Sequence, residues 1–163
     1  MNTSLVNRKA CSVFGHRKIE ITENLKDSLR VYFRNLILND NVKIFYFGGF
    51  GEFDELCWQI VTELKEEYFD LYRIFCLADE RLLRASKRPK WLKECDYEEI
   101  TYFQLKYDYW YSRIYYRNCE IINRSDYVLF YIMKTEGSGA YKVFQYAKQK
   151  KKNITNICKS CKF

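Results

Sequence analysis

The position of its glycines is the feature that most constrains this chain. The sequence has six glycines, and all of them fall at three places where an apolar run gives way to a helical pattern. The clearest is residues 44–47, which run into Gly48-Gly49-Phe50-Gly51 and then into a helical pattern. A continuous apolar run bounded by glycine predicts a strand buried on both faces, as in a parallel sheet. Glycine also allows a positive φ and a close approach of a ligand to the backbone.

The other two glycine corners have the same arrangement. Gly15 follows the apolar run 10–14, and Gly137-Ser138-Gly139-Ala140 follows the run 126–133. Right-handed crossovers bring successive strand ends to the carboxyl edge of a parallel sheet. We therefore expect the three corners to converge at this edge and to form a ligand site.

Hydrophobic periodicity predicts strands and helices in alternation along the whole chain. The expected strands are residues 10–14, 42–47, 73–77, 126–133 and 153–157. Apolar stripes at helical spacing predict helices over residues 22–39, 53–64, 102–124 and 140–147. We expect residues 78–101 to form an irregular insertion between these elements, and residues 158–163 to form a disordered tail after the last one. The pattern predicts one domain over residues 1–163, with a Rossmann-like three-layer α/β/α fold and a mainly parallel sheet.

The net charge of +7 comes entirely from the C-terminal part of the chain. Residues 137–163 contain seven lysines and no acidic residue, so residues 1–136 hold 21 basic and 21 acidic side chains. Nucleic-acid-binding proteins more often distribute Lys and Arg over several elements. We interpret the lysines as the solvated face of a last helix, with nucleic-acid binding through this part as an alternative.

No apolar stretch approaches the roughly 20 residues that span a bilayer, and the first ten residues lack the apolar core of a signal peptide. The seven cysteines are then expected to be thiols in a cytoplasmic protein. Cys158-Lys159-Ser160-Cys161 has the spacing of half a zinc site, but the chain has no second half. We expect no metal and no cofactor, and the sequence leaves open a homo-oligomer.

The glycine corners suit an anionic ligand. Bare N–H groups at a helix N-terminus bind phosphate, and the two groups of candidates are Gly48, Gly49 and Gly51 at one corner and Gly137, Ser138 and Gly139 at the other. Neither corner is the dinucleotide motif G-x-G-x-x-G or a phosphate loop. Tight packing at a strand-to-helix turn is the alternative interpretation.

Four further residues are candidates for binding. His16 and Arg17 could hold a phosphate or ribose, or could be a turn histidine and a solvated arginine. Arg117 and Asn118 lie before a late strand and could bind an oxyanion, unless Glu120 neutralises the arginine internally.

Two roles remain open for the acidic and aromatic residues near these corners. Asp54 could accept from a ribose hydroxyl, or only complement a helix dipole. The aromatic residues 103–116 could stack on a base, although such a stripe is more often part of a core.

These motifs together resemble the SLOG superfamily of Rossmann-like proteins, and in particular its small YpsA-like bacterial members. The resemblance covers residues 9–157 except 78–101, and the residues that carry it are Cys11-Ser12-Val13-Phe14-Gly15-His16-Arg17, Phe45-Tyr46-Phe47-Gly48-Gly49-Phe50-Gly51-Glu52-Phe53-Asp54, Arg117-Asn118, Ser125-Asp126-Tyr127-Val128 and Gly137-Ser138-Gly139-Ala140. It implies a cleft at the carboxyl edge of the sheet for a nucleotide or a nucleotide-derived ligand.

Some members of this superfamily are phosphoribohydrolases that use a glutamate after the late glycine corner. Val143 stands at that position here, and no proline precedes Gly137. The expected function is therefore binding or sensing of a nucleotide-derived molecule, such as ADP-ribose or a cyclic nucleotide, in bacterial or phage signalling or defence. An N-glycosidic hydrolase using Glu52 or Glu55 is the first alternative, and nucleic-acid binding is the second.

Overall fold

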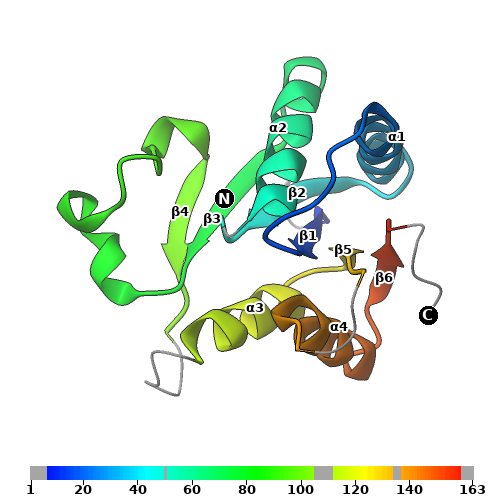
Figure 1. The fold of residues 1–163 in the computed structure, drawn as a ribbon. Helices are drawn as coiled ribbons and strands as arrows, with labels where there is room; N and C mark the ends of the chain where they lie inside the picture. Colours follow the sequence, from blue (N-terminus) through cyan, green and yellow to red (C-terminus); the bar gives the residue numbers. More distant parts are fainter. Residues whose placement is uncertain (1–6, 50, 105–111, 134–136, 159–163) are drawn as a thin grey trace.

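The protein is a three-layer α/β/α structure (Figure 1), seen in a computed structural model that describes residues 7–49, 51–104, 112–133 and 137–158. In chain order its elements are β1 (Lys9–Gly15), α1 (Glu23–Asn39), β2 (Val42–Phe47), α2 (Glu52–Glu67), β3 (Tyr72–Leu77), β4 (Glu99–Tyr102), α3 (Arg113–Asn123), β5 (Tyr127–Tyr131), α4 (Gly139–Gln149) and β6 (Asn153–Asn156).

The six strands form one parallel sheet in the order β4-β3-β2-β1-β5-β6. Helices α1 and α2 cover one face, and α3 and α4 cover the other (Figure 1). One core cluster lies under α1 and α2 around Phe33, Phe45 and Phe53, and a second lies under α3 and α4 around Phe130 and Phe144. The predicted fold class is confirmed, and the sheet is parallel throughout.

Local sequence accounts for the ends of the first two helices. Thr22 caps α1 by accepting a hydrogen bond from the Leu25 N–H at 3.1 Å, and the helix stops before Asn41, whose φ is 56°. Helix α2 starts directly after Gly51, whose φ of 104° only glycine adopts readily. The chain can therefore pass from β2 into α2 within a few residues.

Three expectations about boundaries were wrong. Residues 99–102 of the expected insertion and helix form β4, a short half-buried edge strand paired with β3. Helix α3 begins only at Arg113, and residues 105–111 of the expected long helix lie outside the described residues. Cys158 is not part of a free tail, because its side chain is buried in the core beneath α1.

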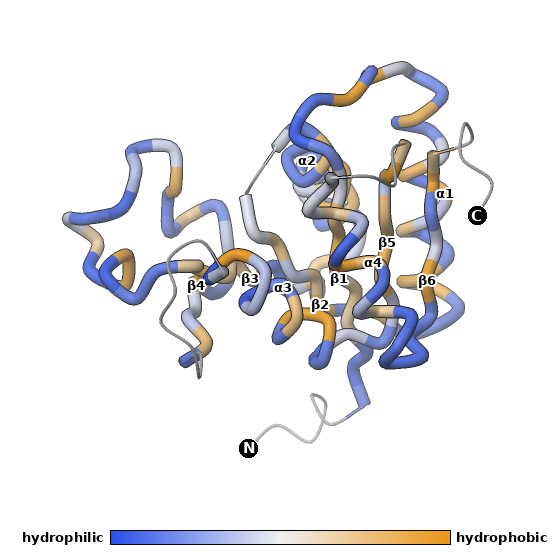
Figure 2. Tube along the Cα trace, turned by 60° about the horizontal axis from the view of Figure 1, so that its bottom comes forward, coloured by the Kyte–Doolittle hydropathy of each residue, from blue (hydrophilic) through white to orange (hydrophobic). Residues whose placement is uncertain are grey.

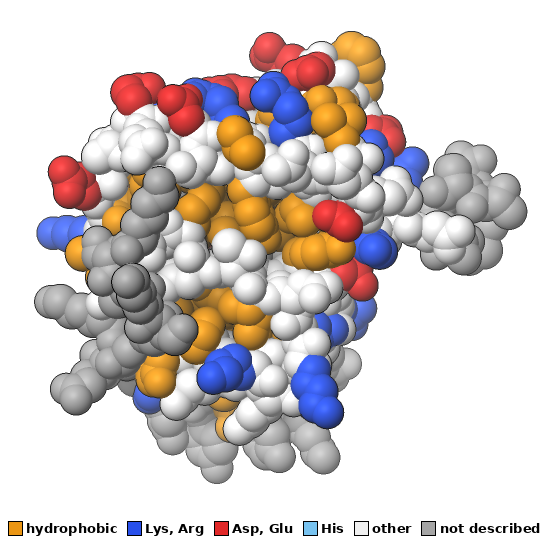
Figure 3. All heavy atoms as spheres, turned by 90° about the vertical axis from the view of Figure 1, so that its right-hand side faces the viewer, with side chains coloured by type: hydrophobic (Ala, Val, Ile, Leu, Met, Phe, Trp, Pro, Cys, Tyr) orange, Lys and Arg blue, Asp and Glu red, His pale blue; other side chains and the backbone are white. Residues whose placement is uncertain are grey.

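The rest of the expected insertion, residues 78–98, contains three short 3₁₀ turns and projects from the β3–β4 side of the molecule (Figures 1 and 2). On the opposite side the sheet ends at β6, and hydrophobic side chains reach the surface there between the helix layers (Figure 3). Within the described residues, no helix has the length and apolarity to cross a bilayer.

Candidate functional site

A cavity of about 620 Å³ opens at the carboxyl edge of the sheet, where the loops after β1 and β5 diverge to opposite faces. This is the topological switch point at which open parallel sheets bind ligands. The structure brings most of the predicted site residues together here: the lining includes Gly15, His16, Arg17, Gly48, Asp54, Arg117, Asn118, Gly137, Ser138 and Gly139.

Several of the conspicuous glycines are needed for packing within the protein itself. A Cβ at Gly15 would overlap the ring of Phe53, and one at Gly49 would overlap the ring of Phe75. At Gly48 a Cβ would stand 2.5 Å from a guanidinium nitrogen of Arg117. These glycines let neighbouring side chains pack against the backbone, so their presence does not require a ligand.

The late glycine corner is different. Among the described residues, no atom comes within 4 Å of a Cβ placed at Gly137 or Gly139, so these residues leave open space beside both. Ser138 caps α4, and its Oγ accepts from the Tyr141 N–H at 3.3 Å. The first N–H groups of a helix have no intrahelical acceptor and carry a partial positive charge. Of the three corners, this one leaves room for an anionic group to reach the backbone.

His16 links the corners after β1 and β5. Its Nε2 accepts a hydrogen bond from the Met133 N–H at 2.8 Å, so the neutral ring carries its proton on Nδ1. Nδ1 lies 3.5 Å from the Ser138 Oγ. The imidazole thus positions the Ser138 corner relative to β1 and presents one wall of the cavity.

The corner at Gly48, Gly49 and Gly51 is the middle glycine corner. The Asp54 carboxylate occupies the position in which the anion of a ligand was expected there. It accepts from the Gly48 N–H at 3.3 Å and from the Gly49 N–H at 2.8 Å. Burial raises the pKa of Asp54 to about 6, against the opposing effect of these two hydrogen bonds and of the nearby Arg117. The Gly48 and Gly49 N–H groups therefore have an acceptor within the protein, and Asp54 holds the backbone of this corner in place.

Arg117 is a buried cation beneath the cavity. Its Nη1 donates to the carbonyl oxygens of Gly48 (3.2 Å) and Cys76 (3.1 Å), while its Nε and Nη2 donate to the Asn118 side-chain oxygen. Desolvation lowers its pKa, and the negative charge of Asp54 opposes that effect. The guanidinium supplies positive potential to the floor of the cavity and ties α3 to the ends of β2 and β3.

Two of the described polar residues in the lining, Lys142 and Tyr115, were not among the predicted site residues. Lys142 lies one turn into α4 and adds a third cation, after Arg17 and Arg117. Asp54 is the one carboxylate that the described part of the chain contributes to the lining. Tyr115 lines the wall from α3, from the aromatic segment that could stack on a base. A lysine one turn after a glycine corner was the available signal for Lys142.

The remaining predicted residues line a second cavity of about 500 Å³. Gly49, Gly51, Glu52 and Glu55 lie there, and Arg17 and Asp54 border both cavities. The Glu52 carboxylate accepts from the Ile19 N–H at 2.8 Å. The two candidate acids of the hydrolase alternative are thus separated from the late glycine corner. Among residues 7–49, 51–104, 112–133 and 137–158, no group of His, Cys, Asp and Glu side chains could hold a metal.

No protein-family model and no curated protein matches the chain. The fold is similar to two solved structures of the molybdenum cofactor carrier protein from Chlamydomonas reinhardtii, with TM-scores of 0.52 and 0.53 and sequence identities of 11% and 15%. Both alignments cover 90% of this chain and 74% of the other. At these identities the likeness establishes a shared Rossmann-like architecture and leaves the ligand to be inferred from the site.

Proposed function

We propose that this protein binds a small phosphate-bearing molecule derived from a nucleotide, in the cavity between the loops after β1 and β5. The observation that carries the proposal is the open late corner, where the Gly137 and Gly139 backbone faces empty space at the start of α4. Helix N-termini of this kind bind phosphate. Membership of the SLOG superfamily would agree with this ligand class.

The charges around the cavity support an anionic ligand. Among the described residues, Arg17, Arg117 and Lys142 line it together with one carboxylate, Asp54. Its volume of about 620 Å³ falls in the range of small-molecule sites, which is roughly 300–1,000 Å³. The structural neighbours bear the name of a cofactor carrier, and a carrier or sensor role suits a cavity whose described lining residues place no carboxylate on α4.

Calorimetry with a panel of nucleotides, comparing wild type with Gly139→Val, tests the proposal. Gly139 has open space beside it and no positive φ, so valine should fold normally while filling the position of the ligand. We expect the affinity of the variant for the nucleotide to fall at least about tenfold. This corresponds to the loss of a phosphate contact that contributes more than about 1.4 kcal/mol, because the valine side chain blocks it. Undiminished binding by the variant, or no binding of any nucleotide to wild type, would contradict the proposal.

A pair of lysine variants separates a local from a general charge effect. Lys142→Ala removes a cation from the cavity, whereas Lys148→Ala removes one from an exposed position further along α4. Only the first should weaken nucleotide binding. Equal losses in both variants would favour nonspecific attraction, including nucleic-acid binding by the lysine-rich end.

Hydrolysis of an N-glycosidic bond is a second candidate function, supported by Asp54. Its raised pKa of about 6 is suited to proton transfer near neutral pH, and it borders both cavities. Release of free base from a nucleoside monophosphate, measured by chromatography, should then be lost in Asp54→Asn. Release that is absent from wild type, or unchanged in the variant, would reject this candidate.

A further inference from the structure

The second cavity combines aromatic rings with carboxylates. It lies between the start of α2 and residues 91–97, and its lining includes Trp58, Trp91 and Tyr97. Arg17 and Asp54 also line the first cavity, so the two cavities adjoin. Their characters differ, because the first is rich in cations and glycine backbone.

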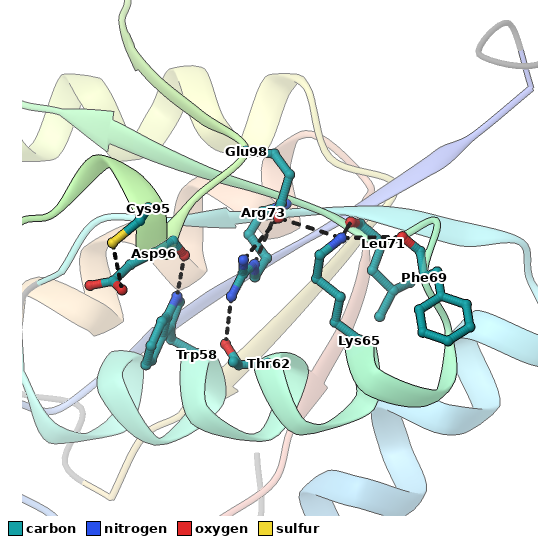
Figure 4. Close-up of polar contacts among 9 residues, drawn as sticks. All are labelled: Trp58, Thr62, Lys65, Phe69, Leu71, Arg73, Cys95, Asp96 and Glu98. Atoms are coloured by element: carbon teal, nitrogen blue, oxygen red, sulfur yellow. Dashed lines mark hydrogen bonds and ion pairs between the residues drawn. The ribbon is translucent and has the colours of Figure 1, made fainter.

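Trp58, one ring of the aromatic wall of the second cavity, is held in place by a polar contact (Figure 4). Trp58 Nε1 donates to the Asp96 carbonyl oxygen at 3.2 Å, and the Tyr97 ring centre is 6.0 Å from that of Trp58. Arg73 lies 5.9 Å from the Trp58 ring centre, and Glu98 holds its guanidinium at 2.8 Å. A ligand would meet rings that are already ordered, which reduces the entropy lost on binding.

Trp91 reaches over this cavity from the projecting segment. Trp91 is 58% exposed, although large aromatic residues are usually well buried. The tip of its indole would lie 3.2 Å from a Cβ at Gly49, so the ring leans over the middle glycine corner. An ordered, exposed indole beside a cavity provides a surface on which a planar ring can stack.

The charges favour a heterocycle that donates hydrogen bonds. The described lining contains four carboxylates, those of Glu52, Asp54, Glu55 and Asp96, and one cation, Arg17. Asp54 and Glu52 already accept backbone N–H groups. Within the described part of the chain, no hydrogen bond or ion pair involves the Glu55 carboxylate, so both of its oxygens can accept from a ligand.

We propose that the second cavity binds the planar heterocycle of a ligand whose anionic group occupies the first. Its ring N–H and adjacent amino group donate to a carboxylate, with Glu55 as the acceptor and Trp91 as the stacking surface. Guanine and pterin rings share this pair of adjacent donors, whereas adenine lacks the ring N–H on that edge. The inference rests on the proposed function for the position of the anionic group.

The test is calorimetry of the full chain with GMP, neopterin monophosphate, AMP, guanosine and inorganic phosphate. We expect GMP or neopterin monophosphate to bind at least about tenfold more tightly than AMP, since adenine keeps an amino donor but has a ring-nitrogen acceptor where the other two rings have an N–H donor. The tighter of the two identifies whether the ring is a purine or a pterin.

Substitutions with matched controls assign the effect to the second cavity. Trp91→Ala and Glu55→Gln should each weaken the preferred ligand about tenfold, and Trp91→Phe should retain most of the affinity. The controls are Phe69→Ala, which removes another exposed aromatic ring, and Glu66→Gln, which changes an exposed carboxylate further along α2. Both should bind like wild type, and circular dichroism should show all variants folded.

The outcomes separate this inference from the proposed function. AMP binding as tightly as GMP and neopterin monophosphate, or preferred-ligand affinity unaffected by Trp91→Ala and Glu55→Gln, would overturn the heterocycle site while leaving phosphate binding intact. Guanosine binding as tightly as GMP, with the same sensitivity to Trp91→Ala, would support the heterocycle site and contradict the phosphate site. No binding of any probe would overturn both.

Discussion

Asp54 should make the folded protein more stable in mild acid than at neutral pH. Its pKa is raised from 3.8 to about 6 because the carboxyl is buried beside the middle glycine corner. Between about pH 4 and pH 6 the folded protein keeps a proton that the unfolded chain has released, so stability rises as the pH falls through this range. At about 1.4 kcal/mol per pKa unit, ionised Asp54 costs the folded state about 3 kcal/mol.

The comparison that isolates this effect is urea unfolding of wild type and Asp54→Asn at about pH 7.5 and about pH 5. The variant cannot titrate at this position, and every other group is common to both proteins. The stability of wild type relative to the variant should increase by about 1–2 kcal/mol on going to the lower pH. Glu66→Gln, which changes an exposed carboxylate further along α2, should show no such difference.

A direct titration makes the reasoning testable even if Asp54→Asn fails to fold. The carboxyl carbon of Asp54, followed by nuclear magnetic resonance in wild type, should titrate near pH 6. A midpoint near the ordinary value, or a stability difference that is flat or falls in acid, would show that the Gly48 and Gly49 N–H groups and Arg117 outweigh the burial of the carboxylate.

Two further predictions concern packing and the wall of the second cavity. Gly15→Ala should destabilise the fold by about 1–3 kcal/mol in urea unfolding, because the new methyl group would overlap the buried Phe53 ring. Glu98→Ala should cost about 2–3 kcal/mol, because it leaves the buried Arg73 guanidinium without its carboxylate partner.

Each of these two has a matched control on the same molecule. Gly139→Ala places a methyl group in open space and should change stability by less than about 0.5 kcal/mol. Glu99→Ala, next to Glu98 but exposed, should behave likewise. If Gly139→Ala or Glu99→Ala lowered the free energy of unfolding as much as Gly15→Ala or Glu98→Ala, the steric overlap and the lost ion pair would not be the causes.

Much of the fold could be predicted from the sequence because each pattern depends on local physics. The run 42–47 is apolar or aromatic except for Lys43 because β2 lies inside the sheet, and Thr22 has the side chain that caps α1. Edge strand β4 was missed because one exposed and three half-buried residues carry little hydrophobic signal. The expected helix start at Tyr102 was wrong because Tyr102 pairs with β3 as part of β4, a long-range contact that the local aromatic pattern does not encode.

The convergence of the site was determined by the sequence, and its chemistry was decided by the tertiary structure. Glycines at three strand ends, together with right-handed crossovers, suffice to bring the corners to one edge of a parallel sheet. Whether a glycine serves packing or a ligand depends on what stands beside its missing Cβ: Phe53 beside Gly15, but open space beside Gly139. Likewise, only the fold brings Trp91 over Gly49, because these two residues are far apart in the sequence and no local pattern encodes their contact.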